Sequence, residues 1–425
     1  MDFELPEHHK QIIELIKWLA REKLRPLGLE FDKKEEPIPP DHPFFYEIKA
    51  MGIEMGMFSG GKEGKEDKDN LRERMKRFGI SGDVQNPMLA TLAVVGAEIL
   101  AWGDQGVAMS FPGPGLASPP IRIMANDYQR EIFNEVFKKS EKPVWGAFGL
   151  TEPGAGSDVA RIRTTARKEG NYYVLNGEKM YITNGARAEW VVVFATVDPK
   201  LGRAGHRAFL VRKGTPGFKV SRIEKKMGLH ASETAGLVFE ECKVPAELLL
   251  GGEEYYKSKE GFKGAMETFN MTRPAVASMA IGIARAAYEY TRDYFAENYM
   301  LNAVSPLAVK VKSEIERMKR KLDLSRWMCL KAAYLMDMKK PNAKEASEAK
   351  AYAPPIALDV ISKCIELLGE EGTLEYHHIV HKAFRDIKVF DIFEGTGQAQ
   401  RIVISKRLFT SKGKPAEWIE QAATN

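Results

Sequence analysis

A block of short strand-type runs in the middle of the chain constrains the fold more than any other feature. We predict strands, from runs rich in β-branched and aromatic residues, at Tyr172 to Leu175, Met180 to Thr183, Trp190 to Thr196, Arg207 to Arg212, Phe218 to Ile223 and Leu237 to Glu240. Asparagine-glycine pairs at Asn176-Gly177 and Asn184-Gly185 predict tight turns between them. Short strands joined by tight turns favour a small antiparallel β domain.

Apolar residues recur at helical spacing on both sides of this block. The predicted helical segments are Glu7 to Lys23, Met88 to Ala101, Gln129 to Phe137, Val276 to Phe295, Leu307 to Met338 and Pro354 to Leu368. Pro26 is expected to end the first of them. The charged, Gly-rich residues 59–87 predict an exposed, mobile insertion. We therefore expect a mostly α-helical protein with an N-terminal helical domain at 1–140, a central β domain at 141–250 and a C-terminal four-helix bundle at 251–425.

Composition narrows the function classes. The 425 residues are 44% hydrophobic, which is enough to fill two or three packed subdomains. The longest nearly apolar run, Leu89 to Trp102, is too short to span a bilayer, and the N-terminus does not read as a signal, so we expect a cytoplasmic protein outside the membrane. The net charge of +5 is small, and no basic stripe with interleaved aromatics indicates nucleic-acid binding.

Neither the cysteines nor the histidines predict a metal site. Three cysteines, Cys242, Cys329 and Cys364, have no metal-type spacing and are expected to be reduced and buried. The cluster that runs from His377 to His381 has helical spacing but no matching Cys, Asp or Glu set. We therefore expect no metal.

A Gly-rich stretch opens the predicted β domain. It reads Phe148-Gly149-Leu150-Thr151-Glu152-Pro153-Gly154-Ala155-Gly156-Ser157-Asp158. Gly154 and Gly156 allow backbone N–H groups to approach a ligand without an intervening Cβ, and Thr151 and Ser157 add side-chain donors. This combination suits a phosphate or the edge of a heteroaromatic ring. A surface turn between two strands is the alternative interpretation of a lone Gly-x-Gly.

Two further stretches carry chemistry. Lys179-Met180-Tyr181-Ile182-Thr183-Asn184-Gly185 reads as a strand that ends in a turn, with Tyr181 and Thr183 on one face. Asp391-Ile392-Phe393-Glu394-Gly395-Thr396-Gly397-Gln398 places Glu394 between an aromatic residue and a Gly-Thr-Gly turn, where burial would raise its pKa towards that of a working base. No predicted strand leads through Gly-x-Gly-x-x-Gly into a helix, which argues against a nicotinamide site.

Together these three stretches resemble the acyl-CoA dehydrogenase family of flavoenzymes, in the family's order and over nearly the whole chain. The resemblance implies FAD between the β domain and the C-terminal helices, with an acyl-CoA thioester between the flavin and Glu394. Glu394 would remove the α-proton, and the β-hydrogen would leave as hydride to flavin N5. Electrons would pass to an electron-transferring flavoprotein.

The resemblance also assigns roles to individual residues. Cofactor contacts are implied for Phe148, Leu150, Thr151, Ser157, Tyr181, Thr183, Thr396 and Gln398. Among these, Thr183 would bond the N5 edge, Tyr181 would cover the ring, and Thr151 would contact the pyrimidine side. Substrate contacts are implied for Ser157, Phe269, Asn270, Arg273 and Gly395, and Asn270 stands where the family frequently has Asp. The backbone N–H of Glu394 would help to bind the enolate oxygen.

Departures from the family pattern leave alternatives open. Two prolines, Pro112 and Pro114, interrupt a region where the family has a continuous helix near the acyl chain, which predicts a branched, cyclic or steroid-like acyl group. Some relatives place the base just before Arg273, but that position is Thr272 here. An oxidase or flavin monooxygenase on the same scaffold would consume oxygen rapidly. A third alternative is a non-catalytic partner subunit. It would fit best if the chain lacked the base, but Glu394 is present.

The expected assembly is a tetramer. In the family's homo-oligomers, the neighbouring subunit completes each FAD through an Arg-x-x-Phe-Gly and a Gln-x-x-Gly-Gly segment. These positions read Glu297-Asn298-Tyr299-Met300-Leu301-Asn302 and Glu366-Leu367-Leu368-Gly369-Glu370-Glu371 here. Carboxylates near phosphates repel cofactor. Either a paralogous subunit supplies the missing groups, or a homo-oligomer has rebuilt these contacts.

Overall fold

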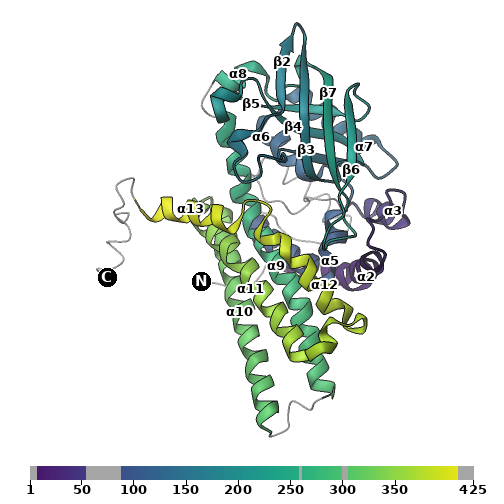
Figure 1. The fold of residues 1–425 in the computed structure, drawn as a ribbon, viewed down its shortest axis with the longest axis vertical. Coiled ribbons are helices and arrows are strands. Elements are labelled where there is room, and N and C mark those ends of the chain that lie inside the picture. The colour runs from purple at the N-terminus through teal and green to yellow at the C-terminus, as the bar shows by residue number, and fades with distance from the viewer. Residues whose placement is uncertain (1–6, 54–87, 258–260, 299–304, 410–425) are drawn as a thin grey trace. The chain divides into compact units, whose positions relative to one another are not determined.

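The computed structural model describes residues 7–53, 88–257, 261–298 and 305–409, so the predicted insertion at 59–87 lies outside the described residues. The chain forms two compact units (Figure 1). We call the first the helical unit; it takes its described residues from 1–32, 58–105 and 270–425. The second, the β unit, takes them from 33–57 and 106–269. The three-domain division at 140 and 250 stays a prediction.

The N-terminal helices belong mainly to the helical unit. Helix α1 (Glu7–Leu19) continues through a π-helical turn at Ala20–Leu24 into α2 (Arg25–Lys34). The expectation that Pro26 ends this helical run is therefore wrong. Proline is tolerated in the first turn of a helix, where its missing N–H would have no intrahelical partner, and the wider π turn precedes it here. Helix α1 packs through Ile12 and Ile16 against α5 (Leu89–Met109).

Three long helices form the bundle of the helical unit: α9 (Gly261–Asn298), which belongs to this unit from residue 270 on, α10 (Pro306–Asp337) and α11 (Ala343–Leu368). Helices α10 and α11 run side by side (Figure 1). The predicted start of the third segment at Pro354 is wrong, because α11 begins at Ala343 and continues through Pro354 and Pro355. Interior prolines remove helix hydrogen bonds, at a cost of about 3 kcal/mol or more for a proline. Tertiary packing on α10, α12 (His378–Asp386) and α13 (Gly397–Leu408) offsets this cost.

The histidine cluster takes part in hydrogen-bonded networks of the helical unit. His378 Nε2 lies 2.7 Å from a carboxylate oxygen of Asp32, which also pairs with Arg385. His377 shares a 2.7 Å hydrogen bond with the hydroxyl of Tyr290. Within the described residues, no group of three or more His, Cys, Asp or Glu side chains is arranged to hold a metal. These contacts account for the cluster as part of the packing of α12.

The β unit is built on a seven-stranded sheet in the order β1-β4-β2-β3-β7-β6, with β5 pairing β4. Its strands are β1 (Trp145–Gly149), β2 (Thr165–Glu169), β3 (Tyr172–Thr183), β4 (Ala188–Thr196), β5 (His206–Arg212), β6 (Phe218–Ile223) and β7 (Thr234–Pro245). Most pairings are antiparallel, as predicted, but β4 pairs in parallel with β1 and at one position with β2. The sequence prediction missed β1 and β2. Apolar clusters cover both faces, and helices α6 (Ser118–Met124) and α7 (Asp127–Lys139) contribute to one of them.

One predicted turn is part of a strand. Asn176-Gly177 lies inside β3, where the register against β7 shifts between Leu175 and Gly177. Gly177 has a φ of 147°, and a Cβ there would meet Thr164 at 2.6 Å. The pair therefore marks a β-bulge and a close backbone approach rather than a hairpin turn.

The structure confirms the helix break that was predicted at the two prolines. Helix α5 ends at Met109, and α6 begins only at Ser118. Between them Gly113 joins the edge of the sheet: its N–H donates to the carbonyl of Val144 at 2.7 Å, and its carbonyl accepts from Gly146 at 2.9 Å. None of the helices in the described ranges combines the length and the apolar character that a membrane span requires.

Candidate active site

The Gly-rich stretch and the end of β3 meet in the β unit. Strand β3 leaves its ladder with β7 between Lys179 and Ile182, and the freed N–H of Met180 donates to the carbonyl of Thr151 at 3.0 Å. From the interior, Lys179 Nζ donates to the carbonyl of Leu150 at 3.2 Å. The structure thus brings together the sequence-predicted residues Leu150 and Thr151 with the segment that carries Tyr181 and Thr183.

A buried ion pair fastens this junction. Lys179 Nζ lies 2.6 Å from Glu152 Oε1, and both side chains are almost completely buried. Glu152 also accepts the backbone N–H of Thr164 at 3.0 Å. Burial lowers the pKa of Lys179 to about 8, although the charge of Glu152 acts to raise it. Burial alone would raise the pKa of Glu152, but the charge of Lys179 and the hydrogen bonds lower it. This satisfied carboxylate holds the turn in one shape.

Tyr181 has the backbone conformation expected of a constrained site. Its φ is +60°, in the left-handed region that bulky residues rarely adopt, and its side chain is 60% exposed. A strained residue with an exposed aromatic ring is a candidate for contact with a ligand. Thr183, two residues on, is half-buried and pairs with Thr234 of β7.

The remaining cofactor candidates of the β unit have mixed environments. Phe148 on β1 is half-buried and packs edge-on against Phe194, with 5.4 Å between ring centroids. Ser157 is exposed. Around Gly154 and Gly156, no heavy atom of the described residues, apart from the glycine and its chain neighbours, lies within 4 Å of the position that a Cβ would take. The turn therefore leaves its backbone accessible, as a cofactor that lies against it requires.

In the helical unit, Glu394 stands on a short loop between a 3-10 turn (Ile387–Asp391) and α13. Its φ is +56°, and the residue is half-buried. The hydroxyl of Thr272, on α9, donates to Glu394 Oε2 at 3.0 Å. Burial raises the pKa of Glu394, while the Thr272 hydrogen bond and the charges of Lys350 and Arg273 lower it. The carboxylate is thus a stronger base than an exposed glutamate.

The residues after Glu394 shape the loop. Gly395 has a φ of +88°, and its carbonyl accepts from the buried Gln400 side chain at 3.1 Å. The hydroxyl of Thr396 caps α13 by accepting the N–H of Ala399 at 3.2 Å. Gln398, another cofactor candidate, is exposed in the first turn of α13. Thr396 therefore has a structural partner already, and Gln398 is available to a ligand.

Two cationic side chains lie near Glu394, of which the sequence analysis predicted one. Arg273, predicted to line the CoA path, is buried, and its guanidinium donates to Ser347 at 3.4 Å. Lys350 on α11 is fully buried and was not predicted. Its signal was nevertheless present, because Lys350 interrupts the stripe of small buried residues formed by Ala346, Ala349, Ala353 and Ala357.

The predicted site residues thus form two groups, one in each unit. The β unit holds Phe148, Leu150, Thr151, Ser157, Tyr181 and Thr183, and the helical unit holds Arg273, Glu394, Gly395, Thr396 and Gln398. The side chains of Phe269 and Asn270 lie outside the described residues. The exposed aromatic ring and open glycine backbone of the first group fit a flat heteroaromatic cofactor. The half-buried carboxylate of the second fits a base.

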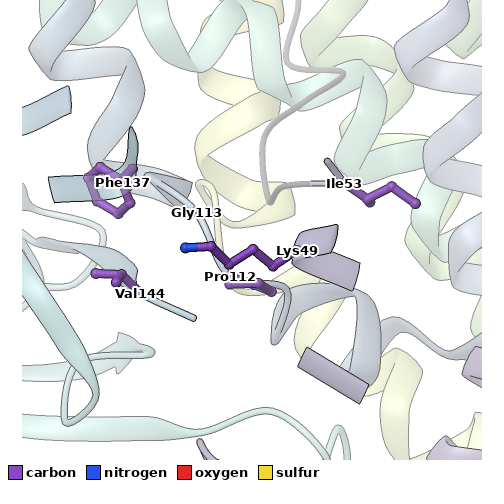
Figure 2. A pocket seen from close by; sticks show the side chains of 6 residues that line it. All are labelled: Lys49, Ile53, Pro112, Gly113, Phe137 and Val144. Atoms are coloured by element: carbon purple, nitrogen blue, oxygen red, sulfur yellow. The ribbon is translucent and has the colours of Figure 1, made fainter. Parts of the chain in front are cut away.

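A cavity beside the proline interruption does not fit either ligand. It is lined by Lys49, Ile53, Pro112, Gly113, Phe137 and Val144 (Figure 2). Its volume is about 30 Å³, which is near the space of one water, whereas ligand pockets measure roughly 300–1,000 Å³. Lys49 Nζ already donates to the carbonyls of Ser140 and Lys142 at 2.6 and 2.8 Å. We therefore assign no ligand to this hollow.

Comparison with known proteins identifies the family. Two family models match, the acyl-CoA dehydrogenase middle domain over residues 147–242 and the acyl-CoA dehydrogenase C-terminal domain over residues 259–409. The chain is 33% identical over 410 residues to the short-chain-specific acyl-CoA dehydrogenase of Clostridium acetobutylicum, which covers 96% of this chain and 100% of that enzyme.

Solved structures agree with this match. The butyryl-CoA dehydrogenase from Megasphaera elsdenii has a TM-score of 0.79 and 32% identity, covering 95% of this chain and 98% of that one. A chain in the structure of the electron-transferring flavoprotein of Acidaminococcus fermentans, described in terms of flavin-based electron bifurcation, also has a TM-score of 0.79 and 32% identity, covering 97% and 100%. The predicted fold class and the predicted FAD cofactor are confirmed at the level of the family. The chain belongs to the acyl-CoA dehydrogenase family of FAD-dependent oxidoreductases.

Proposed function

We propose that this acyl-CoA dehydrogenase oxidises a short-chain acyl-CoA thioester between its α and β carbons, with Glu394 as the base. The environment of Glu394 carries this proposal. Its carboxylate is half-buried on a loop with a positive φ, and Thr272 fixes one of its oxygens. Strained backbone conformations cluster at active sites, which supports a functional role for Glu394.

The proton transfer follows from the contacts of this carboxylate. Thr272 bonds Oε2, so we assign Oε1 as the atom that takes the α-proton. Burial raises the pKa of Glu394, which makes the ionised form a better proton acceptor. Because Thr272 and the nearby cations oppose that rise, the carboxylate can still be ionised when substrate arrives. The balance between these effects sets the working pH.

Stabilisation of the enolate oxygen is assigned to the backbone. The N–H groups of Ile392 and Phe393 both donate to the carbonyl of Val389, at 2.9 and 3.0 Å, so that turn closes just before Glu394. We assign the next N–H, that of Glu394, to the thioester oxygen. A backbone donor fixed in place stabilises developing negative charge without reorganising during the reaction.

In the β unit, Tyr181, Thr183 and Thr151 would hold the isoalloxazine ring of FAD. When bound, FAD supplies the acceptor for the β-hydrogen with its electron pair. The exposed ring of Tyr181 offers a stacking surface, and the Lys179–Glu152 pair and the Met180 hydrogen bond keep it next to Thr151. Phe148, Leu150, Ser157, Thr396 and Gln398 stay predicted cofactor contacts, while Ser157, Phe269, Asn270, Arg273 and Gly395 stay predicted substrate contacts.

Two observations favour different acyl groups for the substrate. The Pro112 and Pro114 interruption predicts a branched, cyclic or steroid-like group. The names of the relatives, short-chain-specific and butyryl-CoA dehydrogenase, favour a short straight chain. We therefore propose a short-chain substrate.

Mixing the purified enzyme anaerobically with a panel of straight-chain, branched and cyclic thioesters tests this proposal. Bleaching of the flavin absorbance reports reduction by each thioester. Butyryl-CoA is expected to bleach fastest. A clear preference for a bulky thioester would refute the short-chain assignment and restore the expectation from the prolines.

We propose an electron-transferring flavoprotein as the electron acceptor. The support is the similarity to a chain solved in the structure of such a flavoprotein from Acidaminococcus fermentans. Oxygen uptake separates this proposal from the oxidase and monooxygenase alternatives. Substrate-reduced enzyme should react slowly with oxygen and rapidly with an electron-transferring flavoprotein; rapid oxygen consumption would favour an oxidase.

The assembly is proposed to be a tetramer, and an unlike subunit is one way to complete the FAD site. Glu370 and Glu371, in the turn after α11, are exposed, and Glu371 accepts the hydroxyl of Tyr294 at 3.5 Å. This acidic turn is a poor partner for a pyrophosphate on another subunit. Flavin content of the chain purified alone decides the matter: near-stoichiometric FAD with full activity would refute a required paralogous subunit.

A further inference from the structure

A lysine lies buried directly behind the loop that carries Glu394. Lys350 on α11 is 0% exposed and is among the largest fully buried side chains. Its Nζ donates to the carbonyl of Phe390 at 2.5 Å and to that of Gly395 at 3.4 Å. These two carbonyls flank Glu394 in the sequence. One ammonium group therefore ties the two ends of the loop to a long helix.

Within the part of the chain that the structure describes, the ammonium of Lys350 has no carboxylate in direct contact. Among the ion pairs of the described residues, none within 4.0 Å includes Lys350. Buried lysines are rare without such a partner, because burial of an unpaired charge is costly. A neutral amide could donate to the same two carbonyls at less cost. The ammonium therefore adds a charge to the hydrogen bonds that it donates to this loop.

The charged groups that interact with Lys350 show where its charge acts. The charges of Asp391 and Glu394 on the loop raise the pKa of Lys350, and the charge of Arg273 on α9 lowers it. Burial lowers the pKa of Lys350 to about 8, and the two carboxylates oppose this change. In return, the charges of Lys350 and Arg273 lower the pKa of Glu394 against the effect of burial. Below pH about 8, Lys350 thus carries a charge that favours the ionised base.

We propose that Lys350 is a positioning residue for the base: it holds the Phe390–Gly395 loop in the shape that presents Glu394, and its charge keeps that carboxylate ionised. The inference rests on the proposed role of Glu394 in proton removal. Lys350 touches neither substrate nor cofactor in this account. It acts through the loop and through the electrostatic potential at Glu394.

Three variants separate the charge of Lys350 from its hydrogen bonds. Lys350→Gln keeps an N–H donor for the carbonyls without the charge, Lys350→Arg keeps both, and Lys350→Met removes both. Val360→Ala is the control for destabilisation, because Val360 is buried on the same helix about 15 Å further along it, at a rise of about 1.5 Å per residue. The pH dependence of kcat/KM is measured for each folded variant.

The acid limb of the profile should move to higher pH in Lys350→Gln and stay in place in Lys350→Arg and Val360→Ala. Lys350→Met should show the same shift with a lower kcat at the plateau. KM should change little, because Lys350 does not contact substrate. An unshifted acid limb in Lys350→Gln would overturn the proposed role of the charge.

Infrared titration of the Glu394 carboxyl, assigned by its loss in Glu394→Gln, provides a readout that does not require turnover. It should show the same upward shift of the Glu394 pKa in Lys350→Gln. Wild-type protein offers a test without any Lys350 variant: raising the pH through about 8 should perturb the carboxylate band as Lys350 loses its proton. An unperturbed band would contradict the inference.

These readouts distinguish the two levels of the account. If Glu394→Gln still dehydrogenates substrate, the proposed base is wrong, yet the infrared titration still reports on Lys350. If Glu394→Gln is inactive while Lys350→Gln leaves the titration of Glu394 unchanged, the base stands and the role of Lys350 fails.

Discussion

Replacing Thr272 by valine removes one hydrogen bond to the base and keeps the size of the side chain. The hydroxyl of Thr272 donates to Glu394 Oε2 at 3.0 Å and favours the ionised carboxylate. Hydrogen bonds to charged groups contribute about 1.5–3 kcal/mol, and the half-exposed setting of Glu394 argues for the lower end. Ionisation of Glu394 should therefore cost about 1.5 kcal/mol more in Thr272→Val, or roughly tenfold in its equilibrium.

The sign of the effect on activity follows directly. A base works in its ionised form, so a higher pKa moves the acid limb of kcat/KM to higher pH. At a pH on that limb, Thr272→Val should lose roughly tenfold in kcat/KM, and the loss should disappear at the alkaline plateau. Steady-state rates with butyryl-CoA from acid to alkaline pH measure both regimes.

Thr291→Val is the matched control, because it makes the same change on the same helix. The hydroxyl of Thr291 donates to the carbonyl of Ala287 at 2.9 Å, within α9 itself. This control should leave the acid limb unmoved. A Thr272→Val profile that coincides with the control would refute the claim that Thr272 tunes the base.

Two further outcomes are expected from the β unit. Tyr181→Asn should keep the left-handed backbone with less strain, so the free energy of unfolding of the apoprotein should stay the same or rise slightly. The variant should release FAD more readily, because it lacks the aromatic ring. An unchanged FAD affinity would contradict the role of the ring. Lys179 has its pKa lowered from 10.5 to about 8, so the unfolded state binds more protons between those values, and this group should add about 1.4 kcal/mol to the free energy of unfolding per pH unit there. Denaturant unfolding should show this gain in wild-type protein and its absence in Lys179→Met, and equal slopes would contradict the assignment.

The fold class could be predicted from the sequence because two signals change at the same places along the chain. The spacing of apolar residues switches from helical to strand type, and turn residues become frequent, where the β domain begins. Prolines were the main source of error in the details. Pro26 and Pro354 both read locally as helix ends, yet Pro26 falls in the first turn of α2 and Pro354 lies inside α11. Contacts between residues far apart in the sequence decide both cases, and a rule based on neighbouring residues does not include such contacts. Asn176-Gly177 likewise reads as a turn, but the long β7 strand pairs across it.

The candidate site divides in the same way. Glu394, Tyr181 and Thr183 were predictable because each stands in a short motif with its neighbours. Thr272 and Lys350 come from α9 and α11 and reach the base only through the tertiary structure. Their sequence signals were weak: Thr272 is one residue from a predicted contact, and Lys350 is a lone cation among small buried residues.

The central claim is that Glu394 removes the α-proton, and single-turnover reduction of Glu394→Gln tests it most directly. Glutamine keeps the volume of the side chain and still accepts a hydrogen bond from Thr272, but its amide does not take up the proton. The variant should fold, retain FAD and bind butyryl-CoA, yet its flavin should fail to bleach on anaerobic mixing. Bleaching at the wild-type rate would contradict the account.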